Sequence, residues 1–237
     1  MGVTRAPIAV ALDAPNLATV TDWAREVGPF VSTLKVGLEA YLRDGRSAVD
    51  AARLAAPDCA IFLDLKLHDI PATVAGAARA IRDVAPDLLT VHAAGGSAMI
   101  AAAVEALPRT RIVAVTVLTS LTDADLVALG LQQEATASAR DLAVRLAVEA
   151  VAAGAGAIVC SPEEVADIRA AVPSRDVLLI TPGVRPAGAD LVDQRRVATP
   201  AEALRRGADL LVIGRPITGA DDPARAAEAI ARDLTDG

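Results

Sequence analysis

The chain has 237 residues, of which 53% are apolar, and its formal net charge is −7. This length fits one large domain, and the apolar fraction is enough to fill a sizeable core. The acidic balance, an aromatic content of 2% and the lack of a basic run argue against a nucleic-acid groove. The start lacks a signal-peptide layout, and the longest uncharged stretch, residues 91–104, is too short to span a bilayer. We therefore expect a cytoplasmic protein with neither nucleic-acid nor membrane partners.

Short apolar runs that are rich in β-branched residues alternate with amphipathic stretches along the whole chain. We predict buried parallel strands at residues 8–12, 33–36, 60–66, 88–92, 112–118, 157–160, 177–181 and 210–213. Helical patterns lie at residues 16–27, 71–84, 97–107, 137–153, 162–171, 200–206 and 222–234. Eight strand–helix units predict an α/β fold, the (β/α)8 TIM barrel, as a single domain over residues 1–237. An open doubly wound sheet is the alternative.

Only two of the 23 basic residues are lysines, Lys35 and Lys66. A composition bias explains the arginines, but it would remove lysine wherever arginine serves equally well. Lysine can give up its proton in a protein, whereas arginine cannot. The two lysines are therefore candidates for positions that need a compact ammonium or a transferable proton. Two surface residues left by chance are the alternative.

Charged residues gather at the ends of the first three predicted strands. Because strand side chains alternate between faces, Asp64 and Lys66 point the same way. The same alternation places Asp13 and Lys35 on the inner face, at the end of the barrel that carries active sites. A layer of structural ion pairs is the alternative, although buried ion pairs stabilise little. Asp69 lies beyond its strand, in a loop exposed to a substrate or to a second subunit.

The two histidines and the two cysteines carry weaker signals. His68 and His92 are possible general bases, but a structural, hydrogen-bonded role is commoner for a histidine at a strand end, and we favour that role. Cys59 and Cys160 lie far apart without CxxC spacing. We expect both to be reduced core residues and not metal ligands.

Two loops after the last predicted strands have the pattern of a phosphate site. Gly183 and Arg185 follow the seventh strand, and Gly214 and Arg215 follow the eighth. Barrels often bind phosphate with these loops, because glycine permits close backbone approach and arginine forms paired hydrogen bonds. Gln194 adds a neutral donor, and its long loop, residues 182–199, is a candidate lid. Ordinary turns with two surface arginines are the alternative.

One segment carries a specific family resemblance. Asp64-Leu65-Lys66-Leu67-His68-Asp69-Ile70-Pro71 closely resembles the signature of orotidine 5′-phosphate decarboxylases, a DxKxxD core followed by Ile-Pro. The similarity covers nearly the whole chain, with the order and spacing of the bacterial members. Leu67 departs from the pattern, since many members have phenylalanine there. We predict that it lies on the outer face and leaves the chemistry unchanged.

The resemblance implies an enzyme that converts orotidine 5′-phosphate to UMP in pyrimidine biosynthesis without a metal or cofactor. It implies that Lys66 protonates the carbon that loses CO2, that Asp64 lies beside the substrate carboxylate, and that Asp13 and Lys35 hold the ribose. Asp69 would reach into the partner's site in an obligate homodimer with shared active sites. The other implied substrate contacts are Ile70 and Thr73 beside Asp69, Thr119 and Pro182 at the pyrimidine, and Arg185, Gln194, Gly214 and Arg215 at the 5′-phosphate.

Two other functions stay open. A barrel enzyme with the same DxKxxD layout can act on a sugar phosphate such as 3-keto-gulonate 6-phosphate with Mg2+. Residues 68–71 and the loop that holds Arg185 argue against it. A non-catalytic barrel that binds phosphoribosyl groups is the second, and the two retained lysines argue against it.

Overall fold

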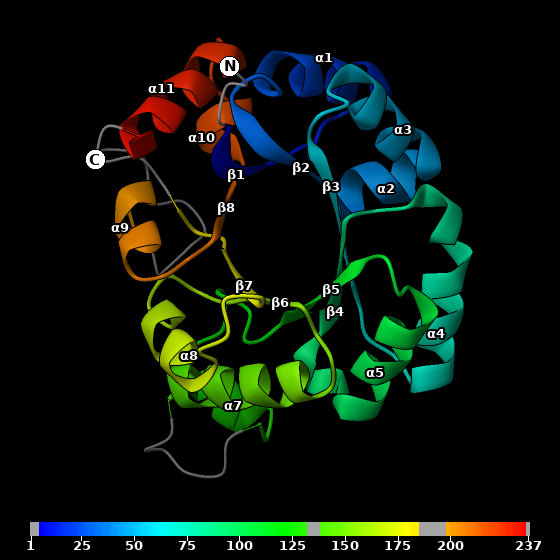
Figure 1. Ribbon diagram of the computed structural model, residues 1–237, viewed down its shortest axis with the longest axis vertical. Helices are drawn as coiled ribbons and strands as arrows, with labels where there is room; N and C mark the ends of the chain where they lie inside the picture. Colours follow the sequence, from blue (N-terminus) through cyan, green and yellow to red (C-terminus); the bar gives the residue numbers. More distant parts are fainter. Residues whose placement is uncertain (1–4, 132–137, 185–197, 236–237) are drawn as a thin grey trace.

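The computed structural model describes residues 5–131, 138–184 and 198–235. Eight parallel strands close into a barrel in sequence order, with helices around the outside (Figure 1). The strands are β1 (Ala6–Ala11), β2 (Val31–Gly37), β3 (Ala60–Leu67), β4 (Leu88–His92), β5 (Arg111–Val115), β6 (Ala157–Val159), β7 (Leu178–Thr181) and β8 (Leu210–Ile213). The predicted TIM barrel is confirmed, and the open sheet is excluded because β1 pairs with β8.

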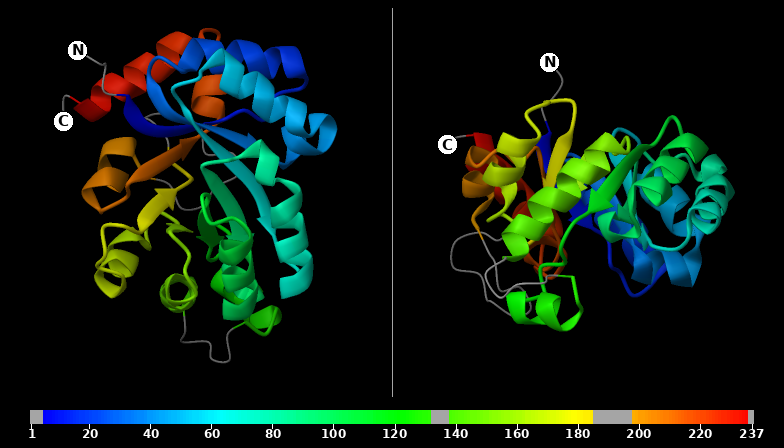
Figure 2. Two further views of the ribbon diagram at one scale, coloured as in Figure 1. Left: turned by 45° about the vertical axis from the view of Figure 1, so that its right-hand side comes forward. Right: turned by 90° about the horizontal axis from the view of Figure 1, so that it is seen from below.

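Eleven α-helices lie in the described part of the chain. They are α1 (Leu17–Val27), α2 (Leu38–Asp44), α3 (Arg46–Ala55), α4 (Pro71–Ala80), α5 (Ser97–Ala106), α6 (Asp123–Ala128), α7 (Ala139–Ala152), α8 (Val165–Ala171), α9 (Pro200–Arg205), α10 (Arg215–Thr218) and α11 (Pro223–Thr235). Figure 2 shows α1 and α11, from opposite ends of the sequence, packed side by side, which completes the ring of helices. Within the described residues, no helix is both long enough and apolar enough to cross a membrane.

The strands bury both of their faces, which explains their continuous apolar sequence. One face packs under the helices and forms the larger core. The other face fills the barrel with a compact cluster, formed by Ala9, Phe62, Leu88, Val113, Ala157, Ile180 and Leu210. Phe62, 1% exposed, is the largest member of this inner cluster. The polar site is therefore built on a packed apolar floor.

Three predicted boundaries differ from the structure by three residues or more. Strand β5 ends at Val115 and not at residue 118, because its neighbours β4 and β6 end at His92 and Val159, which pair with Val115. The helix predicted over residues 71–84 ends at Ala80, and a 3-10 turn at Arg82–Val84 follows. The helix predicted from residue 162 begins at Val165.

The prediction named no helix between residues 37 and 60, where the structure has α2 and α3. Gly45 separates them with a φ of 57°, a conformation that glycine adopts without strain. Helix α3 buries only small side chains, namely Ala48, Val49 and Ala52. These positions recur at helical spacing, so the sequence does contain the signal for α3, and the absence of this helix from the prediction is an error.

Candidate active site

Four charged side chains of alternating sign meet at the carboxyl ends of β1, β2 and β3. The ammonium of Lys66 lies 2.8 Å from both carboxylate oxygens of Asp64. The ammonium of Lys35 lies 3.3 Å from Asp64 and 3.6 Å from Asp13. Asp64 and Lys35 are nearly buried, whereas 32% of the Lys66 side chain and 47% of the Asp13 side chain are exposed. Sequence alternation predicted this group, and the structure brings all four residues together.

The cluster depends on the glycine that ends β2. Gly37 pairs with Asp64 across the sheet. A β-carbon at Gly37 would lie 2.6 Å from an oxygen of Asp13 and 2.9 Å from the ammonium of Lys35. Any larger side chain would therefore push these two charged groups away from their observed positions. The requirement at Gly37 is for space, since its φ of −94° is accessible to all residues.

The electrostatic environment keeps Asp64 ionised. Burial alone would raise the pKa of this carboxyl, because a charge is poorly solvated in the interior. The charges of Lys35 and Lys66 and the hydrogen bonds from Lys66 and Thr90 outweigh that effect and lower the pKa below its ordinary value of 3.8. At neutral pH, Asp64 is therefore a fixed negative charge beside two ammonium groups.

Lys66 has an unusual backbone conformation. Its φ is 50°, in the left-handed region, where a residue with a side chain is strained by about 1–3 kcal/mol. The pairing of β3 with β4 is irregular at this point, since Leu63 pairs with Leu89 but Leu67 pairs with Val91. Simple alternation of side chains therefore predicted the right neighbours for Lys66, but it did not predict the left-handed backbone or the irregular pairing. Strained residues of this kind concentrate at functional sites.

Two adjoining cavities open on the charged cluster. A mainly apolar cavity of about 210 Å³ is lined by Lys35, Phe62, Asp64, Lys66, Val115, Val117, Leu118, Thr119, Val159, Cys160, Pro182 and Val212. A more polar cavity of about 280 Å³ is lined by Ala11, Asp13, Lys35, Asp64, Pro182, Gly183, Val184, Val212, Gly214, Arg215 and Pro216. They share Lys35, Asp64, Pro182 and Val212. Together they make one elongated site with a charged middle.

The predicted phosphate loops border the polar cavity. Gly183 has a φ of 79°, which requires glycine, and the short helix α10 begins with Arg215 directly after Gly214. A β-carbon at Gly214 would meet only the methyl of Ala11, at an ordinary 3.5 Å. Gly183 therefore needs glycine for its backbone conformation, whereas the predicted close approach of Gly183 and Gly214 to a phosphate stays a prediction. Arg185 and Gln194, with most of the candidate lid, lie outside the described residues.

The segment that follows β3, from His68 to Thr73, is exposed at every residue. Asp69, Ile70 and Thr73 are all exposed, and Ile70 keeps 66% of its surface. Asp69 accepts a hydrogen bond of 2.6 Å from the backbone nitrogen of Ile70. Among the residues that the structure describes, no ion pair joins Asp69 to Lys35 or Lys66. The expected exposure of Asp69 is observed, and its expected function needs a second chain.

The two histidines and Cys160 lie close to the site without joining the charged cluster, whereas Cys59 lies at the other end of the barrel, directly before β3. The rings of His68 and His92 are 5.2 Å apart. Burial, the neighbouring His68 and the charge of Lys66 lower the pKa of His92, so this ring is neutral at neutral pH. Cys59 and Cys160 are free and buried, as predicted. The structural role of the histidines stays a prediction.

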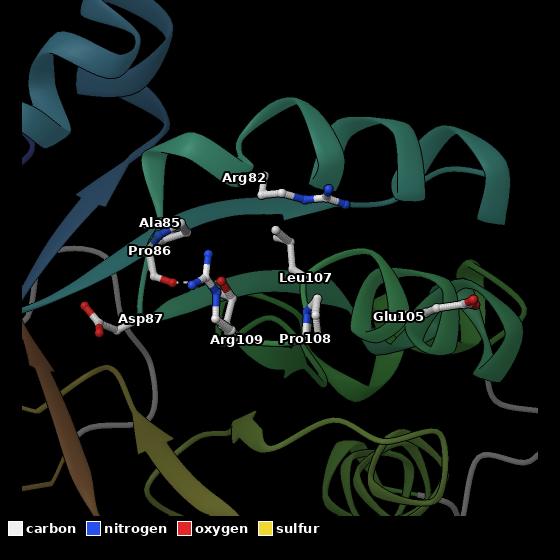
Figure 3. A pocket seen from close by; sticks show the side chains of 9 residues that line it. Arg82, Ala85, Pro86, Asp87, Glu105, Leu107, Pro108 and Arg109 are labelled. Atoms are coloured by element: carbon white, nitrogen blue, oxygen red, sulfur yellow. Dashed lines mark hydrogen bonds between the residues drawn. The ribbon is translucent and has the colours of Figure 1, made fainter.

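A larger hollow of about 520 Å³ lies at the opposite end of the barrel, before β4 and β5 (Figure 3). Several of its polar side chains form hydrogen bonds with the backbone of neighbouring segments. Arg82 donates to the carbonyl of Ala106, Thr110 donates to the carbonyl of Pro86, and Asp87 accepts from the backbone nitrogen of Ile61. Barrel enzymes place their chemistry at the carboxyl ends of the strands, so size does not identify the active site here.

Comparison with known proteins decides the family. Residues 6–230 match the Orotidine 5′-phosphate decarboxylase / HUMPS family. The chain belongs to this family. It is 64% identical over 229 residues to the orotidine 5′-phosphate decarboxylase of Thermobifida fusca, covering 97% of this chain and 96% of that protein. It is 53% identical over 249 residues to the enzyme of that name from Frankia casuarinae, covering 98% and 88%.

A solved structure of the family has the same architecture. The crystal structure of orotidine 5′-phosphate decarboxylase from Lactobacillus acidophilus matches with a TM-score of 0.80 and 33% sequence identity, covering 97% of this chain and 99% of that one. The predicted family resemblance is thus confirmed.

Two residues that shape the site of this orotidine 5′-phosphate decarboxylase family member, Gly37 and Thr90, were not predicted from the sequence. Gly37 is not among the predicted site residues, and the spatial reason for it is visible only when β1, β2 and β3 lie side by side. Thr90 was not singled out, although it bonds to both Asp64 and Lys66. A polar residue in the middle of the apolar run at residues 88–92 was the available signal.

Proposed function

We propose that this chain catalyses the decarboxylation of orotidine 5′-phosphate to UMP, a step of pyrimidine biosynthesis. The observation that carries the proposal is the Lys66 ammonium, 2.8 Å from both oxygens of Asp64 and at the wall of an apolar cavity. Membership of the family and full-length relatives of that name support the substrate.

The reaction needs a stabilised negative charge and a proton. When the bond between C6 of the pyrimidine and its carboxylate breaks, the electron pair stays on C6 and CO2 leaves. No carbonyl adjacent to C6 delocalises that pair, so the protein must stabilise it electrostatically. The Lys66 ammonium supplies the opposing charge and then transfers its proton to C6, which forms the C–H bond of UMP. Solvent returns a proton to the neutral lysine after release.

Asp64 and Lys35 determine the position of the Lys66 ammonium and the charge around it. An ionised Asp64 holds the Lys66 ammonium in place through two hydrogen bonds. Beside the substrate carboxylate, the same charge is repulsive before the reaction, and the repulsion falls as CO2 leaves. Lys35 forms ion pairs with Asp64 and Asp13. The charges of Lys35 and Lys66 therefore balance those of Asp13 and Asp64 before substrate binds.

Each of the two cavities binds a different part of the substrate. The pyrimidine occupies the apolar cavity, against Thr119 and Pro182. The ribose hydroxyls meet Asp13 and Lys35 at the junction. The 5′-phosphate occupies the polar cavity, where Gly214 and Arg215 bind it together with Arg185 and Gln194 of the loop that follows β7.

Binding energy far from C6 contributes to the rate. One electrostatic contact of this type is worth roughly 3–4 kcal/mol. Slow reactions need about 20 kcal/mol or more of barrier lowering. The phosphate contacts therefore help to offset the cost of desolvating and orienting the reacting groups, and they affect turnover as well as affinity.

The working unit is a homodimer with shared sites, in which residues 1–237 form one domain. Asp69, Ile70 and Thr73 of one subunit reach the substrate of the other, which accounts for an exposed carboxylate and an exposed isoleucine beside the signature strand. The free thiols of Cys59 and Cys160 are in keeping with a cytoplasmic enzyme.

Purified protein incubated with orotidine 5′-phosphate, with and without EDTA, tests the proposal. We expect UMP and CO2 in equal amounts at a rate that EDTA leaves unchanged. Conversion of 3-keto-gulonate 6-phosphate that EDTA abolishes, with no UMP formed, would assign the chain to the sugar-phosphate enzymes. Nucleotide binding without any turnover would make it a non-catalytic barrel.

A further inference from the structure

A buried threonine on β4 links the two central residues of the site. Thr90 is 0% exposed and lies two residues after Leu88, which faces the inside of the barrel. Since strand side chains alternate, Thr90 faces inward as well, whereas Leu89 and Val91 pack under the helices. The inner face of β4 thus presents a hydroxyl to the irregular end of β3.

The Thr90 hydroxyl makes two hydrogen bonds of different character. It accepts a bond of 2.8 Å from the backbone nitrogen of Lys66. It donates a bond of 3.0 Å to Oδ1 of Asp64, an oxygen that also accepts from the Lys66 ammonium. One hydroxyl therefore contacts both the main chain of the lysine and the carboxylate that holds the lysine side chain.

The irregular pairing of β3 with β4 explains why a side chain is needed here. Four residue steps on β3, from Leu63 to Leu67, face only two on β4, from Leu89 to Val91. The backbone nitrogen of Lys66 accordingly bonds to a side chain of β4 instead of to a carbonyl of the strand ladder. Buried N–H groups without a partner are costly, so the hydroxyl stabilises the left-handed conformation of Lys66.

We propose that Thr90 is a positioning residue for decarboxylation, which rests on the proposed function: its hydroxyl fixes the backbone of Lys66 and the carboxylate of Asp64 in one geometry. Valine has nearly the same shape but no hydroxyl. In Thr90→Val the Lys66 amide therefore loses its hydrogen-bond acceptor, and Oδ1 of Asp64 loses one of its two donors. Serine keeps both bonds and loses only a methyl group.

Three variants separate this role from a general packing effect. We expect Thr90→Val to lower kcat roughly 10- to 100-fold while the Kd for UMP stays within about threefold, because UMP lacks the carboxylate and Thr90 is not among the residues that line the two cavities. Thr90→Ser restores kcat to within about threefold of wild type. The matched control is Thr116→Val on the neighbouring strand end, since Thr116 is also buried but donates to the carbonyl of Val159.

Backbone amide exchange gives a second reading that does not depend on turnover. We expect the Lys66 amide to exchange faster in Thr90→Val than in wild type or Thr116→Val. A Thr90→Val enzyme with kcat within threefold of wild type, or a Thr90→Ser enzyme as slow as Thr90→Val, would overturn the positioning role. A wild-type protein that makes no UMP would instead overturn the proposed function, and the amide exchange would then still test the link between Thr90 and Lys66.

Discussion

The ammonium of Lys66 lies 2.8 Å from both carboxylate oxygens of Asp64, although the two residues are only two positions apart in β3. In a regular strand, side chains at this spacing stand parallel on one face. The left-handed backbone of Lys66 and the irregular pairing with β4 depart from that geometry. The pair thereby combines an ammonium held by two hydrogen bonds with a carboxylate that is ionised at neutral pH, at the wall of a cavity.

Replacing Lys66 with arginine tests the need for a transferable proton. Lys66→Arg keeps the positive charge, but arginine does not give up its proton in a protein. We expect kcat/KM to fall roughly 1,000-fold or more, with a melting temperature close to that of wild type. Steady-state kinetics and thermal unfolding measure the two quantities.

The reverse exchange on the surface is the control for this substitution. Arg25 forms an exposed ion pair with Asp22 on α1, far in sequence from the site residues. Arg25→Lys should leave activity unchanged, because exposed ion pairs contribute little. Substantial activity in a folded Lys66→Arg enzyme would remove the assignment of Lys66 as proton donor.

A methyl group at Gly37 should separate Asp13 from Lys35. The new carbon would lie 2.6 Å from Asp13 and 2.9 Å from Lys35, so both groups must move by several tenths of an ångström or more. We expect Gly37→Ala to lower kcat/KM at least tenfold, since displacements of about 1 Å cost up to 100-fold.

The matched control is Gly76→Ala in α4, where the nearest atom to a new β-carbon is 3.9 Å away. This substitution should preserve activity and stabilise the helix by about 1 kcal/mol. Equal activity in Gly37→Ala and Gly76→Ala would show that the contact between Asp13 and Lys35 has no part in the reaction.

The lowered pKa of Asp64 predicts a pH dependence of stability. A carboxyl whose pKa is lower in the folded than in the unfolded state stabilises the fold above the unfolded value, and that contribution is lost as the pH falls through the folded value. For Asp64, the loss therefore occurs below its ordinary pKa of 3.8. Asp64→Asn has no such contribution at any pH.

Urea unfolding at neutral pH and at about pH 3 measures this difference. The unfolding free energy of wild type should exceed that of Asp64→Asn at neutral pH. This gap between wild type and variant should be smaller at about pH 3. Asp22→Asn on the exposed pair with Arg25 should show almost no gap at either pH. A gap for Asp64→Asn that widens in acid would mean that the folded protein raises this pKa.

Mixing two inactive variants tests the shared site. Asp69→Ala and Lys66→Ala each damage a different half of a composite site, so a mixed dimer contains one intact site. Random exchange of subunits makes half of the dimers mixed, which restores about one quarter of the native sites. The measurement is the rate of UMP formation before and after exchange, and a mixture as inactive as its components would place Asp69 in its own subunit's site.

The sequence predicted the barrel and the charged cluster well because both rest on simple periodicity. Alternation along β3 placed Asp64 and Lys66 on one face, and the scarcity of lysine marked Lys35 and Lys66 as special. These features depend on short stretches of chain and on the fixed location of barrel active sites.

Alternation could not reveal contacts that depend on how neighbouring strands are aligned. The left-handed backbone of Lys66 follows from the extra residues of β3 opposite β4, which sequence periodicity does not contain. Thr90 and Gly37 act across strands for the same reason. Arg185 and Gln194 lie beyond the described residues, and their roles at the phosphate stay predictions.

The absorbance change of orotidine 5′-phosphate on mixing with the purified wild-type protein, in the presence of EDTA, tests the central claim most directly. We predict rapid and complete conversion to UMP, at a rate proportional to enzyme concentration and lost in Lys66→Arg. A folded wild-type protein that binds UMP but leaves orotidine 5′-phosphate unchanged, with and without added Mg2+, would contradict the account.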